Sequence, residues 1–189
     1  MRPSHPARCL LLSFFLLSLR FSPIEETLSD ILHHLCKTEI TLYSPQKLFA
    51  LPPDVRLESL AGDKWKETIR PDTTFYSIQL VGMELRPLLE SSLRNLSSGR
   101  KEYLVWSNVT VSPEETPKIS VGKEPLMPHR VYSVCVEESL LDKNKSPFPQ
   151  LVNRVLKKKQ RVALNVKKAV EEYYQGVLKI TRPGGRIYP

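Results

Sequence analysis

The sequence predicts a single α+β domain with a mainly antiparallel sheet, helices on one face and a long amphipathic C-terminal helix. Three observations lead to this fold class. The chain of 189 residues is 41% hydrophobic and 25% charged, which is typical of a globular domain and excludes collagen and polytopic membrane proteins. Segments with strand-like and helix-like hydrophobic spacing follow one another irregularly. The 16 prolines are scattered between these segments, so they mark the ends of short elements.

The N-terminus is typical of a targeting leader. Two arginines precede the apolar run 9–19, and no acidic residue appears before Glu25. The apolar run is too short to span a bilayer. This pattern predicts a secretory signal peptide over 1–22, followed by one domain over 23–189. A mitochondrial presequence and a buried segment of a nuclear or cytoplasmic protein are the alternatives.

Two further features favour secretion. Asn95 and Asn108 each begin an acceptor pattern for an N-linked glycan. Removal of the leader would leave Cys36 and Cys135 as the only possible disulfide pair, which would close a loop of about 100 residues. In a reducing compartment, the two thiols would instead be small buried apolar groups.

The mature domain begins with a helix. Ser22 is suited to be the N-cap, Pro23 to be the first helical residue, and Glu25 to complete a capping box. Apolar residues at helical spacing follow, so the predicted helix covers 23–37. The β-branched and aromatic segment 40–43 then predicts a short strand.

The middle of the chain alternates between strands and helices. Over 73–81, every second residue is apolar, and Tyr76, Ile78 and Leu80 form the core face of a strand. The next predicted elements are a leucine-rich helix over 83–96, a strand over 102–111, a hairpin partner over 119–121 and a strand over 131–136.

The predicted C-terminal helix, about 148–176, has two contrasting faces. Valines spaced by three and four gather on one side of it. The opposite side is basic and carries Arg154, Lys157, Lys158, Arg161 and Lys168. This basic face is either solvated surface or a binding surface for an acidic protein or a polyanion, in a chain of formal net charge +8. In a nuclear protein the same face would suit nucleic acid.

No catalytic motif is present. The sequence has no phosphate-binding glycine loop, hydrolase elbow or zinc-protease motif. His33, His34 and Cys36 are neighbours on the first helix, and with His129 and Cys135 they offer enough ligands for zinc. Such neighbours on an amphipathic helix are usually packing residues. The sequence therefore predicts no catalytic residue, no metal site and no cofactor.

Together these features predict a non-enzymatic interaction protein. In this interpretation it is a secreted or ER-routed glycoprotein that presents its basic helix to an acidic partner. The alternative is an intracellular subunit of a nuclear or ribonucleoprotein assembly, which uses the same helix to bind nucleic acid or an acidic protein. No transmembrane span is predicted, and the sequence leaves the oligomeric state open.

Overall fold

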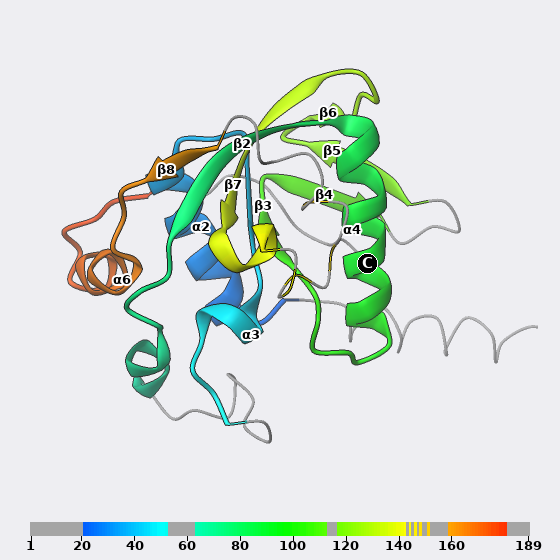
Figure 1. Cartoon of the computed structure of the whole chain (residues 1–189). Helices are drawn as coiled ribbons and strands as arrows, with labels where there is room; N and C mark the ends of the chain where they lie inside the picture. The colour runs from blue at the N-terminus through cyan, green and yellow to red at the C-terminus, as the bar shows by residue number, and fades with distance from the viewer. Residues whose placement is uncertain are drawn as a thin grey trace, which may run out of the picture.

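A computed structural model of the chain describes residues 21–52, 63–112, 117–142, 144, 146, 148, 151 and 159–180. A five-stranded sheet has the strand order β3-β1-β7-β2-β8, and a three-stranded sheet has the order β4-β5-β6 (Figure 1). The strands are β1 (Ile40–Tyr43), β2 (Phe75–Val81), β3 (Val105–Ser107), β4 (Val109–Ser112), β5 (Lys118–Val121), β6 (Glu124–Pro125), β7 (Val131–Glu137) and β8 (Gln160–Val162). The helices are α2 (Pro23–Cys36), α3 (Pro45–Leu48), α4 (Gly82–Ser97) and α6 (Val166–Tyr174), with 3-10 turns η2 (Lys64–Thr68) and η3 (Glu138–Leu141).

The α+β class is confirmed, whereas two of its predicted details are not. The larger sheet is mixed, because β1 pairs with β7 in parallel while its other strand pairs are antiparallel. Figure 1 shows α2 and α6 to one side of β7 and α4 to the other, so the helices do not share one face. None of the helices in the described part of the chain combines the length and apolar character that crossing a membrane requires.

Helix α2 forms as its N-terminal sequence predicts. The Ser22 hydroxyl accepts the backbone N–H of Glu25 at 3.2 Å, and the Glu25 carboxylate accepts the backbone N–H of Ser22 at 2.9 Å. This reciprocal capping box satisfies two backbone donors that a helix start leaves without partners. The helix ends at Lys37, whose φ of 54° lies in the left-handed region. Residues 1–20 lie outside the described residues, so the leader stays a prediction. Phe21 and Ser22, which the predicted leader 1–22 includes, are buried and belong to the fold.

A disulfide ties α2 to the larger sheet. Cys36, the last residue of α2, is bonded to Cys135 of β7, and their Cα atoms are 6.1 Å apart. Both cysteines are buried in the core. The bond therefore fixes the end of the first helix against the central strand of the sheet.

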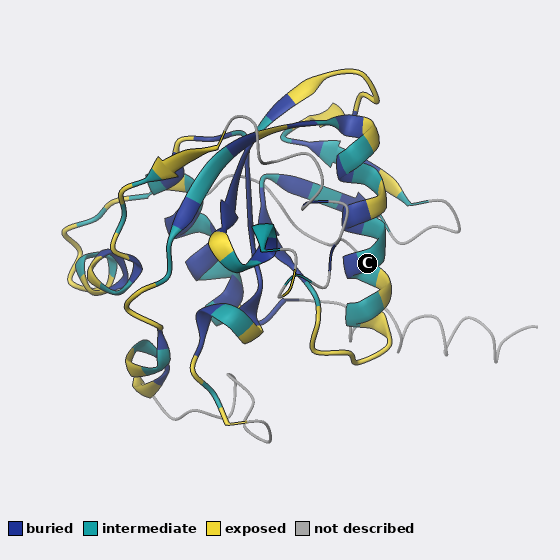
Figure 2. Ribbon diagram, in the orientation of Figure 1, coloured by how far each residue is buried: buried dark blue, intermediate teal, exposed yellow. Residues whose placement is uncertain are grey.

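The core lies between the sheet and its helices, and the buried residues are concentrated along β1, β7 and α2 (Figure 2). The predicted core face of β2 is largely confirmed, since Ile78 and Leu80 are buried and Tyr76 is half-buried. Trp106 of β3 is 1% exposed and packs edge-on against Phe21, with ring centroids 4.9 Å apart. Phe21 thus anchors the chain just before α2 to the core.

The predicted strand over 102–111 is instead two strands in two sheets. Asn108 separates β3 from β4 and has a φ of 58°, a conformation that asparagine tolerates better than most residues. Its side-chain amide donates to the Glu39 carbonyl at 2.8 Å, and its own carbonyl accepts the Gly122 N–H at 2.8 Å. These hydrogen bonds hold the reversal that directs β4 into the smaller sheet.

The predicted continuous helix over 148–176 is wrong. Gln160–Val162 is strand β8, which pairs antiparallel with Phe75–Ser77 of β2 and separates the helical residue Leu151 from helix α6. Residues 152–158 lie outside the described residues. Valines suit a strand as well as a helix, and the free edge of β2 offers backbone partners to a strand. Tertiary pairing therefore overrides the helical spacing at β8.

Candidate functional site

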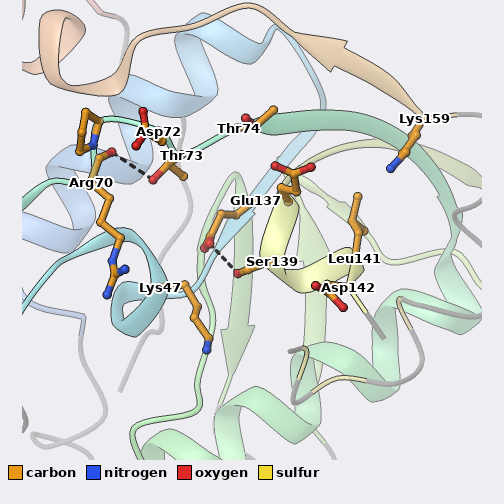
Figure 3. Close-up of a pocket in the computed structure, with 12 residues that line it drawn as sticks. Lys47, Arg70, Asp72, Thr73, Thr74, Glu137, Ser139, Leu141, Asp142 and Lys159 are labelled. Atoms are coloured by element: carbon orange, nitrogen blue, oxygen red, sulfur yellow. Dashed lines mark hydrogen bonds between the residues drawn. The ribbon is translucent and has the colours of Figure 1, made fainter. Parts of the chain in front are cut away.

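A pocket of about 810 Å³ opens where β1 and β7 end and β2 begins (Figure 3). Its walls come from α3, from the segment before β2, from η3 and from the residue before β8. Most of the lining is polar or charged, and it consists of Lys47, Arg70, Pro71, Asp72, Thr73, Thr74, Glu137, Glu138, Ser139, Leu141, Asp142 and Lys159. Segments far apart in the sequence thus meet at one end of the sheet.

Three cationic side chains line this pocket. Lys47 lies on α3, Arg70 precedes β2, and Lys159 precedes β8. Figure 3 shows these three side chains on different sides of Glu137. The Lys159 ammonium lies 4.6 Å from the centre of the Tyr76 ring. Within the described part of the chain, none of the three cations forms an ion pair, so their charges can serve a bound anion.

Glu137 is the buried acid of the pocket. Its side chain is 3% exposed, and one carboxylate oxygen accepts the Ser139 hydroxyl at 2.6 Å. The other oxygen accepts the backbone N–H of Ser44 at 3.3 Å. Burial raises the pKa of the Glu137 carboxyl above its ordinary value of 4.5, although both hydrogen bonds and the charges of Lys47 and Arg70 oppose that rise. The carboxyl therefore titrates closer to neutrality than an exposed glutamate.

The remaining polar residues give the pocket a mixed character. Asp72, Glu138 and Asp142 add carboxylates to its lining. The Glu138 carboxylate accepts the Tyr76 hydroxyl at 3.2 Å, and the Thr73 hydroxyl donates to the Arg70 carbonyl at 3.1 Å. Cations and hydroxyls can bind an anionic group, while carboxylates can accept hydroxyl or amino groups. The pocket is therefore suited to a ligand with one anionic end and one hydroxyl-rich end.

The two described members of the predicted basic face lie on different elements. Arg161 lies on β8 opposite Tyr76, whereas Lys168 lies on α6 with its ammonium 3.6 Å from the Glu172 carboxylate. The other three members, Arg154, Lys157 and Lys158, lie outside the described residues. A strand and a separate helix thus carry the two described members, and they do not share one helical face.

The two predicted glycan acceptors both take part in the fold. The Asn95 amide nitrogen, on α4, donates to the Glu102 carbonyl at 2.6 Å. The Asn108 amide nitrogen donates to the Glu39 carbonyl, as described above. Glycan attachment at either nitrogen stays a prediction.

The two cysteines considered as zinc ligands, Cys36 and Cys135, are bonded to each other in a disulfide. The pKa of His33 is lowered mainly by burial of its side chain and to a smaller extent by the charge of the neighbouring His34. Within the residues that the structure describes, no group of three or more His, Cys, Asp or Glu side chains is placed to hold a metal ion.

Sequence reasoning missed the pocket. Its residues Lys47, Arg70, Glu137 and Lys159 come from separate segments, and no short motif joins them. The available signal was positional, because polar residues follow two predicted strands and precede a third. Polar side chains at strand ends gather at one edge of a sheet only when the strand order brings those ends together.

Solved structures show where else this fold occurs. The chain matches a protein assigned as a 5'-nucleotidase from Staphylococcus aureus, with a TM-score of 0.63 at 10% identity, over 91% of this chain and 37% of that one. It matches a 5'-nucleotidase precursor from Thermus thermophilus with a TM-score of 0.63 at 16% identity, over 92% of this chain and 36% of that one. The NAD nucleotidase of Haemophilus influenzae gives a TM-score of 0.56 at 13% identity, over 81% of this chain and 30% of that one.

No family model matches the chain, and no curated protein matches it by sequence. The chain spans about a third of the length of the solved structures it matches. These matches contradict the prediction of a non-enzymatic interaction protein, because the matched proteins are named as enzymes, three as nucleotidases and one as a sulfate thiohydrolase. They equally contradict the alternative of a nuclear or ribonucleoprotein assembly subunit.

Proposed function

We propose that this chain is the substrate-binding part of a nucleotidase-like hydrolase, and that its pocket binds the phosphate ester of a nucleotide. The observation that carries the proposal is the match of about nine-tenths of the chain to two 5'-nucleotidase structures. The pocket supplies the chemistry, because it faces solvent at the end of a sheet and gathers cations, hydroxyls and carboxylates.

The cations of the pocket are suited to the phosphate end of the ligand. Arg70 offers a planar fork of donors, which fits phosphate oxygens in pairs, while Lys47 and Lys159 act as point charges. These side chains come from three separate segments of the chain that meet at the pocket. A charge-assisted hydrogen bond to such a group contributes about 1.5 to 3 kcal/mol.

The acids of the pocket are suited to the nucleoside end. The carboxylates of Asp72, Glu138 and Asp142 accept hydrogen bonds, and ribose hydroxyls and the amino groups of bases donate them. A simple anion would gain nothing from these acids. The mixed lining therefore favours a phosphate ester with a sugar and base over phosphate alone.

The role proposed here is binding and orientation of the substrate. Cleavage of a phosphate ester requires an activated nucleophile, and metal ions often supply it. The described residues hold no metal-binding group, so we assign no bond-breaking step to them. Positioning of the ester still contributes to the rate of hydrolysis, because a substrate held in the reactive orientation has a smaller entropic barrier to cross.

Single substitutions in the pocket test this function. We expect calorimetric titration to show binding of adenosine 5'-monophosphate, and Lys47→Ala or Arg70→Ala to weaken it about tenfold or more, since each removes a charge-assisted contact. Lys123→Ala is the matched control, because Lys123 is an exposed lysine between β5 and β6 and does not line the pocket. Equal affinities in all four proteins, or no binding in any, would contradict the proposal.

We also propose that the protein passes through the secretory pathway. The Cys36–Cys135 disulfide supports this route, because disulfides persist in oxidising compartments. Protein made in animal cells is expected to lack the leader and to lose mass with glycosidase. Asn95→Gln and Asn108→Gln identify the acceptors. An intact Met1 and a mass that glycosidase leaves unchanged would exclude the route.

A further inference from the structure

The carboxyl group of Glu137 connects two walls of the pocket. Glu137 is the last residue of β7, at the centre of the larger sheet. Its carboxylate accepts the Ser44 N–H, at the start of α3, and the Ser139 hydroxyl, in η3. Lys47 belongs to that same α3. A change in the charge of this carboxyl therefore acts on both walls at once.

The charged groups around Glu137 come from every element that meets there. Lys47 of α3 and Arg70, just before β2, both contribute a favourable field at its carboxylate. Glu138, its neighbour in η3, is exposed and is hydrogen-bonded to Tyr76. The other titratable groups of the pocket are Asp72, Asp142 and Lys159. Glu137 is the buried one among these acids, so it interacts with the cations at the lowest local dielectric.

We propose that Glu137 is a positioning residue whose carboxyl takes up a proton when an anion binds in the pocket. The inference rests on the proposed function and concerns the regulation of the same site. The ionised carboxylate competes with an incoming anion for the charges of Lys47 and Arg70. Two anions in a partly buried site repel each other, so binding favours the neutral carboxyl. The neutral carboxyl also gains an O–H that can donate to the anion.

The direction of the pH effect follows by linkage. Burial already raises the pKa of Glu137 in the free protein, and a bound anion raises it further. The complex then binds more protons than the free protein, so anion affinity falls as pH rises through the pKa of Glu137. The steepest possible dependence for one linked proton is about tenfold per pH unit. The affinity therefore increases as the pH is lowered.

The test uses adenosine 5'-sulfate, whose sulfate group does not titrate in the range examined. Calorimetry between about pH 5 and about pH 8, in buffers of different ionisation enthalpy, measures both affinity and proton uptake. For the unaltered protein we expect proton uptake on binding and an affinity about three- to tenfold higher at the acidic end. Binding with no proton uptake and no pH dependence would overturn the role of Glu137 and leave the proposed function intact. Failure of this nucleotide analogue and of adenosine 5'-monophosphate to bind at any pH would overturn both.

Two variants separate this role from a general charge effect. Glu137→Gln should bind the analogue without proton uptake, and its affinity should be nearly constant with pH. Glu138→Gln removes the same charge from the same pocket, but Glu138 is exposed, and its carboxylate accepts a hydrogen bond from Tyr76 of β2 and none from α3. The affinity of this variant for the analogue is expected to change, so proton uptake is the quantity compared. Glu138→Gln should keep the proton uptake of the unaltered protein. Loss of uptake in Glu138→Gln, or its retention in Glu137→Gln, would assign the proton to another group.

Discussion

Loss of the Cys36–Cys135 disulfide is expected to lower the free energy of unfolding by about 2 to 5 kcal/mol. The two cysteines are 99 residues apart in the sequence, and the bond restricts the unfolded chain between them. In the chain-entropy model, a loop of about 100 residues corresponds to about 4.7 kcal/mol. Urea denaturation of Cys36→Ala/Cys135→Ala, compared with the oxidised protein, measures this difference.

Reduction of the unaltered protein provides the control for this experiment. With excess reductant, its unfolding midpoint should fall to about that of the double variant, while the double variant itself should not respond. Alkylation without reduction should label neither cysteine in the native oxidised protein. Labelling of both, or equal midpoints with and without reductant, would show that the bond is absent from the folded protein.

Truncation of Trp106 should have an effect of similar size. This side chain is 1% exposed, lies on β3 and packs edge-on against Phe21. Trp106→Ala would leave a large cavity beside β1, where Leu42 is the strand partner of Trp106. Burial of a large aromatic side chain is worth about 3 to 5 kcal/mol in such substitutions. Thermal and urea unfolding should both show the loss.

The comparison with Trp106→Phe makes this prediction specific. Within the described residues, the buried indole N–H of Trp106 has no hydrogen-bond partner, and such a group costs about 1 to 3 kcal/mol. Phenylalanine removes that N–H and keeps much of the ring. Trp106→Phe should therefore be much milder than Trp106→Ala. Equal losses for the two variants would mean that packing against Phe21 does not stabilise the fold.

Local sequence patterns predicted the elements whose signals are local. Ser22 and Glu25 are three residues apart, and their capping box forms within one turn of α2. The alternation over Phe75–Val81 describes β2, since its faces are set by the strand's own period. The hairpin of β4 and β5 also joins segments close in sequence. In each case, the interactions that decide the structure lie within a few residues of one another.

Elements decided by distant partners were not predictable in this way. Val162 fits the helical valine spacing of the predicted C-terminal helix, but Gln160–Val162 pair with Phe75–Ser77 of β2. The parallel pairing of β1 with β7 depends on residues such as Ile40 and Val134, which are far apart in the chain. Nothing local in either segment specifies its partner. Long-range pairing therefore explains these two corrections to the predicted fold.

The candidate site also depends on contacts between residues far apart in the sequence. Glu137 ends a strand that the sequence predicts well, yet its importance depends on Lys47 and Arg70 lying beside it. Their approach depends on the strand order, which places the ends of β1 and β7 next to the start of β2. A lysine four residues after a predicted strand has no such meaning by itself. The pocket is thus a property of topology more than of any motif.

The strand order also affects how the chain can fold while it is being synthesised. β7 lies in the middle of the larger sheet, between β1 and β2, although it is synthesised after both of them. Ribosomes add about 5 to 20 residues per second. The edges of β1 and β2 that pair with β7 therefore stay unpaired for several seconds, until β7 has been synthesised. Open strand edges invite pairing with other chains during that interval. A nascent chain of this protein should therefore depend on chaperones until residue Glu137 has emerged, after which the central gap in the sheet closes.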